Sequence, residues 1–429
     1  MRFHPGIPFI LLLIGFLLLI DFYVFSAVKT MTLGLDTRVR KYIHWTFWAI
    51  NIALYSWPIY LAVISSSGQA PARAFSAFFG VFVLFFIPKL VISVILGLED
   101  VSRGIRALYA MGHNSISKES PVPVGITRRQ FISRSAGIIA LVPFLGIAHG
   151  IVSGKFRYRV RRETLYFDDL PDAFDGFTIT QLSDIHSGSF DPEGHLEDVR
   201  EGIKLAQDQN SDLIVFTGDL VNNEAREMIP WKKEFGNLSA PFGKFSILGN
   251  HDYGDYIAWP SAMAKQQNME DLYATHTEIG FRLMRNENAV IEKGGQRLHL
   301  LGVENWGSPP FPQLGDLDKA LEGVPENEFK ILLSHDPTHF DEIVSKHSTH
   351  VHLTLSGHTH GAQFGVEIPG VRWSPVQYRY EHWAGLYPEN KRYLYVNRGF
   401  GFLGFPGRVG IWPEVTVLTL KKGPSPQRA

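Results

Sequence analysis

Histidine, aspartate and asparagine are concentrated in five short blocks in the C-terminal part of this 429-residue chain. In chain order they are Asp184-Ile185-His186, Gly218-Asp219, Gly249-Asn250-His251-Asp252, Ser334-His335-Asp336 and Gly357-His358-Thr359-His360-Gly361. The chain has no cysteine, so imidazole, carboxylate and amide groups are the ligands it offers to a metal. Together the blocks supply enough ligands for two divalent ions.

Charge balance favours phosphate-ester hydrolysis at such a site. Two divalent ions bring four positive charges, of which Asp184 and Asp219 would neutralise two. The remaining candidate ligands are neutral: His186, Asn250, His335, His358 and His360. The excess positive charge attracts a phosphate ester, and a hydroxide bridging the metals would be the nucleophile. A mixed oxygen and nitrogen ligand set suits Mn, Fe, Zn or Ni better than Ca or Mg.

Taken singly, these motifs are weak, because a lone buried histidine is usually part of the core. Their joint occurrence after successive apolar runs has little structural rationale except metal ligation. Other histidines lack that context and are assigned structural roles: His339, His347, His350 and His352.

The blocks resemble the pattern of the calcineurin-like metallophosphoesterases, from about Phe177 to Leu420. The resemblance implies an α/β fold, a four-layer αββα sandwich, with the dinuclear site at the strand ends. It implies that one metal is held by Asp184, His186 and His360, the other by Asn250, His335 and His358, and that Asp219 bridges them. His251 would contact the phosphoryl oxygen and help protonate the leaving group. For Asp252 two roles stay open: orienting His251, or satisfying local backbone groups.

Two departures from the family pattern are visible. The segment Asp219 to Glu224 lacks the acidic residue and arginine found in the protein serine/threonine phosphatase branch, so that branch is not expected. Ala362 and Gln363 stand where relatives usually have two glycines. The order of membrane spans and hydrolase motifs, with Asn397 to Gly401, is similar to the membrane-associated bacterial branch.

Short apolar runs precede the blocks, and the carboxyl ends of parallel strands meet at one sheet edge, where open α/β sheets bind ligands. The expected strands are 164–170, 177–182, 213–217, 245–248, 298–303, 330–333, 351–355, 393–396 and 415–420. Helices are expected near 195–207, 225–235 and 261–279. The alternation predicts a layered α/β domain over 155–420, followed by a disordered tail at 421–429.

The first part of the chain differs in composition. Residues 1–154 form an expected membrane domain with about four transmembrane helices, near 7–27, 43–64, 74–98 and 135–152. Residues 1–150 contain thirteen Lys and Arg against five Asp and Glu, a net charge of +8. The whole chain carries −1, which leaves −9 for the remainder. An acidic soluble part argues against nucleic acid as a partner, and the lack of cysteine excludes disulfide partners.

Loop charges predict the orientation. The connection after the first span carries Lys29, Arg38, Arg40 and Lys41, whereas the next carries only Arg73. By the positive-inside rule the first and third connections are cytoplasmic, and the catalytic domain lies on the extracytoplasmic side of the cell inner membrane. The basic stretch from Lys155 to Arg162 opposes this topology.

Two further features have open interpretations. Thr127-Arg128-Arg129-Gln130-Phe131-Ile132 resembles an internal twin-arginine export signal or is simply a basic flank. Asp21 and Lys89 lie in or near apolar spans; we expect Asp21 at a helix end, and Lys89 snorkelling or facing the bundle interior.

The leading hypothesis is a membrane-anchored, metal-dependent phosphoric ester hydrolase acting on a phosphate mono- or diester, with lipid- and nucleotide-linked esters among the candidates. One alternative is a non-catalytic, metal-binding membrane sensor module. Another, if the domain is cytoplasmic, is an enzyme resembling UDP-2,3-diacylglucosamine pyrophosphatases. A nuclease is disfavoured by the acidic charge and the membrane tether.

Overall fold

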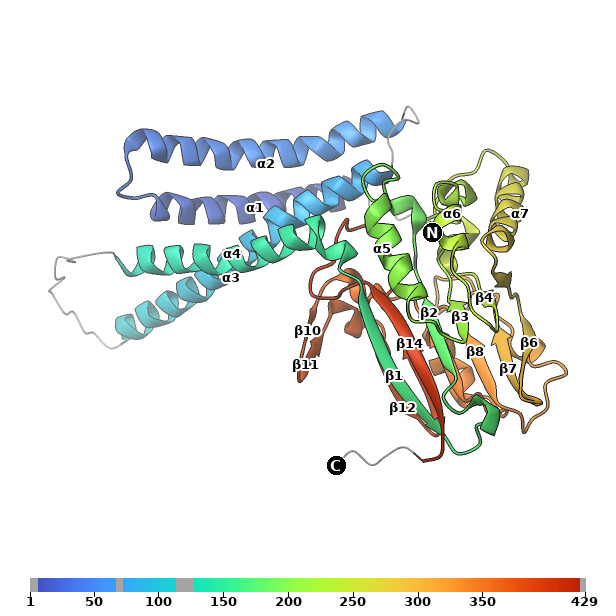
Figure 1. Ribbon diagram of the computed structural model, residues 1–429. Helices are drawn as coiled ribbons and strands as arrows, with labels where there is room; N and C mark the ends of the chain where they lie inside the picture. The colour runs from blue at the N-terminus through green and yellow to red at the C-terminus, as the bar shows by residue number, and fades with distance from the viewer. Residues whose placement is uncertain (1–6, 67–71, 113–126, 425–429) are drawn as a thin grey trace. The chain divides into compact units, whose positions relative to one another are not determined.

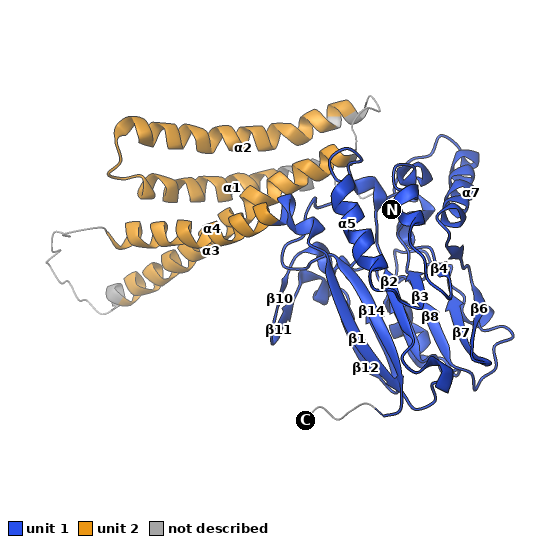
Figure 2. Ribbon diagram, viewed as in Figure 1, with its two compact units in different colours: residues 1, 150–429 blue, residues 2–149 orange. Residues whose placement is uncertain are grey.

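The computed structural model describes residues 7–66, 72–112 and 127–424. The chain divides into two compact units, residues 2–149 and residues 150–429 (Figure 2). Each unit is described by itself below.

The N-terminal unit consists of four long helices, α1 Ile7–Met31, α2 Thr37–Ser66, α3 Ala72–Gly112 and α4 Arg128–Val152 (Figure 1). Three segments among the described residues are long and apolar enough to cross a membrane: Leu12–Met31, Arg73–Tyr109 and Arg128–Val152. All four helices extend beyond the predicted spans. The helix α2 is less apolar than these three, since polar and aromatic residues such as His44, Asn51 and Tyr55 interrupt its aliphatic residues.

A polar network joins three of these helices. Asp21 is 1% exposed in the body of α1, and its carboxylate pairs with Lys89 Nζ of α3 at 2.7 Å. From α2, Tyr55 donates a hydrogen bond to Asp21, and Asn51 accepts one from Lys89. The expectation that Asp21 ends a helix is therefore wrong, because a lysine 68 positions away neutralises it inside the bundle. Lys89 faces the bundle interior, one of the two predicted placements.

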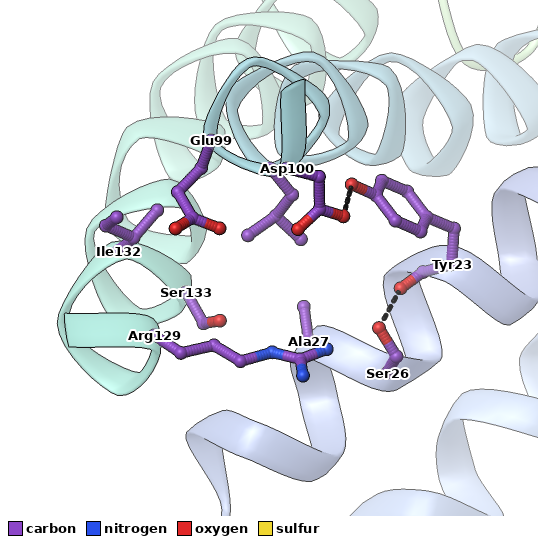
Figure 3. Close-up of a pocket in the computed structure, with 9 residues that line it drawn as sticks. Tyr23, Ser26, Ala27, Glu99, Asp100, Arg129, Ile132 and Ser133 are labelled. Carbon is purple, nitrogen blue, oxygen red and sulfur yellow. Dashed lines mark hydrogen bonds between the residues drawn. The ribbon is translucent and has the colours of Figure 1, made fainter. Parts of the chain in front are cut away.

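The twin-arginine-like segment begins α4. Thr127 Oγ1 accepts from the Gln130 amide at 3.2 Å, and Gln130 Oε1 accepts from the Thr127 amide at 2.9 Å, which is a reciprocal cap of the helix. Arg129 lines a small pocket with Glu99 and Asp100, where Tyr23 donates to Asp100 at 2.7 Å (Figure 3). Thr127 and Gln130 of this segment thus have a structural role at the start of α4, which is independent of any use in export.

Two six-stranded mixed sheets form the C-terminal unit (Figure 1). In the first sheet the order is β1 Arg159–Phe167, β14 Glu414–Lys422, β2 Thr178–Leu182, β3 Leu213–Phe216, β4 Lys244–Ser246 and β5 Arg282–Leu283. The second sheet runs β12 Gly385–Glu389, β13 Arg392–Val396, β9 Leu353–Ser356, β8 Lys330–Leu333, β7 Gln296–Gly302 and β6 Glu287–Lys293. A separate hairpin pairs β10 Val366–Ile368 with β11 Val371–Trp373.

Three apolar cores lie between the four layers of the sandwich. Side chains from both sheets fill the space between them, for example Leu213 and Val215 of β3 against Ile331 of β8. The alternate residues of β3, Ile214 and Phe216, pack under the helices α5 Leu196–Gln207, α6 Lys232–Gly236 and α7 Ala262–Glu278. A third core lies beneath α8 Leu317–Ala320 and α9 Thr338–Glu342. Because the central strands are buried on both faces, they are continuous apolar runs in the sequence. The predicted αββα sandwich is confirmed.

Several boundaries differ from the predictions. The first strand begins at Arg159 rather than Thr164, because its basic residues pair in parallel with β14. The helix expected over 225–235 is split around Pro230, which lacks an amide donor, into the 3-10 turn Ala225–Met228 and α6. Lys421 and Lys422, expected in the disordered tail, continue β14 opposite Tyr166 and Phe167. Residues 425–429 lie outside the described part.

Candidate metal centre

The five polar blocks follow five strand ends. Asp184 comes after β2, Asp219 after β3 and Asn250 after β4, three parallel neighbours in the first sheet. In the second sheet His335 follows β8, and His358 and His360 follow the parallel neighbour β9. The loops at these carboxyl ends bring the predicted residues together.

The backbone of these loops is unusual. Five of the predicted ligands have positive φ angles between 48° and 71°: Asp184, His186, Asp219, His358 and His360. Left-handed backbone is uncommon for residues other than glycine and is concentrated at functional sites. A Cβ atom at Gly357 would overlap Ser183 Oγ and Asp184 Oδ2, so glycine is required where the two loops approach.

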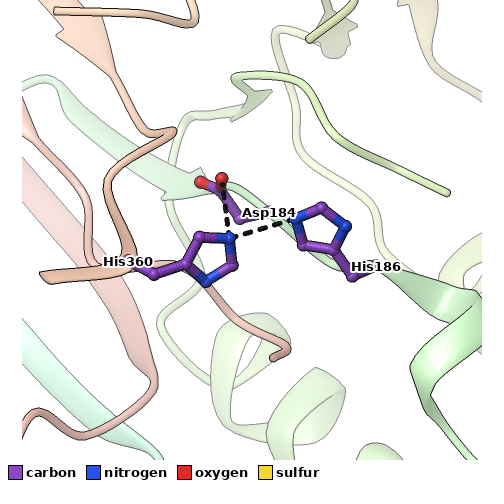
Figure 4. Close-up of side chains that lie close together, drawn as sticks. All are labelled: Asp184, His186 and His360. Carbon is purple, nitrogen blue, oxygen red and sulfur yellow. Dashed lines mark hydrogen bonds and ion pairs between the residues drawn. The ribbon is translucent and has the colours of Figure 1, made fainter. Parts of the chain in front are cut away.

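The first cluster contains Asp184, His186 and His360 (Figure 4). His186 Nε2 lies 3.0 Å from His360 Nε2, and His360 Nε2 lies 3.2 Å from Asp184 Oδ1. All three side chains are buried. Their ligand atoms converge on one point, as the ligands of a metal ion do.

The second cluster contains Asp219, His335 and His358. His335 Nε2 is 3.2 Å from Asp219 Oδ2 and 3.3 Å from His358 Nδ1. The same Asp219 oxygen lies 3.4 Å from His186 Nε2 of the first cluster. Asp219 therefore stands between the two clusters, where a shared ligand would be.

Asn250 tests whether these residues fit metal ions. Its Nδ2 donates to Tyr256 Oη at 2.7 Å, which leaves Oδ1 as the free end of the amide. That oxygen is buried and has no hydrogen-bond partner among the described residues. A buried unpaired carbonyl oxygen is costly unless something binds it. The unpaired oxygen, aimed beside the two clusters, fits a cation ligand.

The electrostatics agree with that fit. Burial lowers the pKa of His186 well below its ordinary value and lowers the pKa of His358, so both rings are neutral and keep a lone pair. Burial opposes ionisation of Asp219, yet His335 and His251 hold its pKa well below the usual range. For His335, burial lowers the pKa, but Asp219 and Asp184 outweigh it and raise the pKa to about 10. The carboxylates thus favour a positive charge at this point.

His251 lies beside both clusters without joining either. Its ring nitrogen Nδ1 donates to the Asn222 carbonyl oxygen at 2.9 Å, so Nε2 is the free end of the ring. The ring stacks on Tyr256 with centroids 4.4 Å apart and meets His186 edge to face at 5.0 Å. This fixes the direction in which the imidazole can exchange a proton.

Asp252 is fully buried and bonds only to backbone. Its Oδ1 accepts from the amides of Leu220 and Val221 at 2.9 and 3.2 Å, and its Oδ2 accepts from those of Asp219 and Gly249 at 2.9 Å. The carboxylate therefore joins the loop after β3 to the loop after β4. It reaches His251 through the chain, not through a direct side-chain contact.

Several residues near the centre carry no sequence signal of their own. Tyr380 Oη lies 2.8 Å from His358 Nε2, and the guanidinium of the buried Arg408 lies 3.2 Å from His360 Nδ1. Asp336 Oδ2 lies 3.3 Å from His358 Nε2, and only its position next to His335 could have pointed to it. The other two are distant in sequence from the motifs that they support.

Other residues near the C-terminal motifs have structural roles. Arg398 is held by Glu414 and Glu367 at 2.6 Å each and so pins its turn. Phe400, Phe402 and Phe405 are buried. His339 bonds to Ser334 and His352 to the Lys330 amide, as expected for core histidines.

Both parts of the chain match families of known proteins. Residues 177–362 match the family described as calcineurin-like phosphoesterase, and residues 5–155 match one described as probable calcineurin-like phosphoesterase, transmembrane domain. An uncharacterized metallophosphoesterase of Bacillus subtilis, YkuE, is 31% identical over 309 residues, covering 69% of this chain and 98% of that protein.

Two further relatives are similar at lower identity. The phosphodiesterase YaeI of Escherichia coli is 28% identical, with 69% of this chain and 99% of that protein covered. A transmembrane protein with metallophosphoesterase domain from Danio rerio is 27% identical, covering 66% of this chain and 62% of that protein.

Proposed function

This chain belongs to the calcineurin-like phosphoesterase family, and from that premise we propose that it hydrolyses a phosphate mono- or diester at a pair of divalent metal ions beside a membrane. That it is a metal-dependent phosphoester hydrolase and a membrane protein follows from the family matches. The dinuclear centre, the ligand assignment and the class of ester are the proposal.

We assign one metal to Asp184, His186 and His360, the second to Asn250, His335 and His358, and the bridging position to Asp219. The unpaired, buried Asn250 Oδ1 is the single observation that best supports the proposal. Mn, Fe, Zn or Ni would suit the mixed donor set. When bound, such ions supply Lewis-acid charge and lower the pKa of water, which removes the need for a protein nucleophile.

The protein's own residues have three roles in this proposal. His251, oriented by the Asn222 carbonyl, presents Nε2 to the phosphoryl group, and in its doubly protonated form it donates the Nε2 proton to the leaving oxygen. Asp252 is a positioning residue, because its four backbone hydrogen bonds hold the loops that carry Asp219 and Asn250. The neutral ligands leave net positive charge for an anionic ester.

The location of the enzyme is also proposed. We place it in the cell inner membrane as a multi-pass protein with its catalytic domain on the extracytoplasmic side. The supporting observation is the excess of Lys and Arg in the first and third connections of the membrane unit over the second.

Replacing Asp219 with Asn tests the reaction. The variant loses the carboxylate shared by the two clusters, so turnover of bis-p-nitrophenyl phosphate by metal-loaded protein should fall below detection. Asp271→Asn, an exposed position on α7, is the matched control and should keep wild-type turnover. Unchanged turnover in Asp219→Asn would refute the assignment.

Replacing His251 with Gln separates proton transfer from metal binding. Elemental analysis should find metal content equal to the wild type, while kcat falls by about 10²- to 10⁴-fold, the usual contribution of a general acid. Loss of metal in this variant would instead assign His251 to the ligand set.

A further inference from the structure

The hairpin formed by β10 and β11 presents an apolar face to its surroundings. In its register Val366 lies opposite Trp373, and Ile368 lies opposite Val371, so these four side chains share one face. They are 43%, 38%, 58% and 50% exposed, respectively. We call these four residues the hairpin face. No other described part of the catalytic unit buries it.

The polar residues of the same hairpin point the other way. Glu367 pairs with Arg161 at 2.5 Å and with Arg398 at 2.6 Å. Arg372 donates to the Ala384 carbonyl oxygen at 2.6 Å and lies 5.3 Å from the centre of the Trp383 ring. This is the reverse of a hairpin on a water-soluble protein, whose polar face meets solvent. The anchored polar face fixes the apolar face outward.

The base of the hairpin is linked through Arg408 and Val409 to Gly150, the first residue of the catalytic unit. Gly365 donates to the Val409 carbonyl at 2.9 Å, and the Val409 amide donates to the Gln363 carbonyl at 2.8 Å. The neighbouring Arg408 amide donates to the carbonyl of Gly150 at 3.1 Å. Gly150 belongs to the catalytic unit and to the last turn of α4, a segment apolar enough to cross a membrane. The segment Arg408–Val409 therefore bonds both to the base of the hairpin and to Gly150, where the catalytic unit begins.

Basic residues mark the same region. The segment after α4 contains Lys155, Arg157, Arg159, Arg161 and Arg162, of which Arg157, Arg159 and Arg162 are exposed. Arg157 lies 5.1 Å from the centre of the Trp412 ring. Cationic and aromatic side chains are typical of the level of lipid headgroups, where they complement anionic lipids. This argues for a bilayer as the partner of the hairpin face.

The hairpin is also directly connected to the proposed metal centre. The 3-10 turn His360–Gln363 leads into β10, and Ser374, which follows β11, donates to the Gly361 carbonyl at 2.8 Å. The hairpin therefore follows directly in the chain from the turn that carries His360 and is bonded back to it.

We propose that the hairpin face inserts into the headgroup and acyl boundary of the bilayer that contains the chain's own helices, and that the adjacent centre takes an amphiphilic phosphate ester whose acyl chains remain in that bilayer. The insertion is independent of the proposed function, because it rests on the hairpin and the basic residues near its base, whereas the substrate class rests on the proposed function.

Fluorescence tests the insertion. The chain has no cysteine, so a single Cys placed at Ile368 can carry an environment-sensitive nitrobenzoxadiazole dye in the full-length protein. In vesicles of phosphatidylcholine and phosphatidylglycerol, we expect blue-shifted emission and quenching by nitroxide-labelled lipid. Val290, 45% exposed on the edge strand β6, is the matched control position and should show neither effect. Emission at 368 identical to that at 290 overturns the proposal.

Single-copy nanodiscs distinguish lipid from a second copy of the chain. A blue shift at position 368 that persists in nanodiscs holding one protein supports the bilayer. A shift that appears only in vesicles with many copies shows that the face binds another copy, and overturns the proposal.

Kinetics test the substrate class separately. In the Ile368→Ser, Val371→Ser double variant, the ratio of turnover of a long-chain phosphate ester in vesicles to that of its short-chain soluble analogue should fall about tenfold. Val290→Ser should leave the ratio unchanged, and an unchanged ratio in the hairpin variant overturns the substrate inference. If wild-type protein cleaves neither ester, the proposed function fails while the fluorescence result still decides the insertion.

Discussion

At the scale of single residues, Tyr380 orients a proposed metal ligand, His358, through a hydrogen bond to its ring. If His358 offers Nδ1 to a metal, its Nε2 carries the proton and donates to Tyr380 Oη at 2.8 Å. Such outer partners fix the ring orientation and tautomer of a ligating histidine. Tyr380 is 7% exposed, so water cannot readily replace its hydroxyl group.

Tyr380→Phe should therefore weaken metal binding by about 10- to 100-fold, the usual effect of losing an outer partner. Titration of metal-free protein with Mn²⁺ or Zn²⁺ measures the change in affinity. Tyr378→Phe, two positions earlier and 80% exposed, is the control and should bind metal as the wild type does. Equal affinities in the two variants would remove Tyr380 from the support of the site.

His276 gives a prediction about pH. It lies on α7, fully buried, with Nδ1 2.9 Å from Ser246 Oγ, and burial lowers its pKa to about 3. An unfolded histidine takes up its proton near pH 6.5, so between about pH 6.5 and 3 the unfolded state binds one more proton than the folded state. The neutral ring thus contributes stability above pH 6.5, and that contribution is lost as the pH falls, by about 1.4 kcal/mol per pH unit.

The free energy of unfolding should fall less steeply with acid in His276→Gln than in the wild type, by the slope of one proton. Denaturant unfolding of detergent-solubilised protein between pH 7 and 4, followed by tryptophan fluorescence, gives both slopes. Parallel pH profiles for the two proteins would show that this ring does not control acid stability.

At the scale of elements, the ion pair of Asp21 and Lys89 joins α1 and α3 within their apolar stretches. Removing one member of a buried ion pair leaves an uncompensated charge, which costs about 3 to 5 kcal/mol in protein interiors. Lys89→Met should therefore unfold at a clearly lower temperature than the wild type, because Asp21 loses its partner.

The double variant Asp21→Asn, Lys89→Met should recover most of that loss, since no charge remains buried. Size-exclusion chromatography of detergent-solubilised protein after heating measures the surviving fraction. Lys29→Met, which changes an exposed lysine of α1, is the control and should behave as the wild type. A double variant no more stable than Lys89→Met would show that the network acts through more than its charges.

The strands of the two sheets differ in how well the sequence predicts them. The strand ends that carry Asp184, Asp219 and His335 were predictable, because central strands buried on both faces are short apolar runs followed directly by polar blocks. The edge strands β5, β6 and β12 were not predicted, since they are short or rich in polar residues.

The missed parts depend on contacts between distant residues. Asp21 is neutralised by Lys89, 68 positions away, and Arg408 reaches His360 across 48 positions. The β10 and β11 segments are too short to show a strand pattern, and their apolar residues face outward rather than into a core. No local pattern encodes such pairings.

At the scale of the whole molecule, two charge patterns predict opposite orientations. Lys29, Arg38, Arg40 and Lys41 in the first connection place it in the cytoplasm and the catalytic domain outside. The basic segment from Lys155 to Arg162 would by the same rule hold the domain inside. Because orientation is set by short loops near the spans, and the first span usually dominates, we expect the domain outside.

Cysteine accessibility decides between them, since the chain has no cysteine of its own. A Cys at Met263, 79% exposed on α7, should react with a membrane-impermeant maleimide in intact spheroplasts. A Cys at the exposed Arg38 should react only after lysis. The reverse pattern would place the metal centre in the cytoplasm, where the basic segment after α4 would obey the positive-inside rule and cytoplasmic nucleotide-linked lipids would become candidate substrates. In that case the proposed insertion of the hairpin face would be into the inner leaflet.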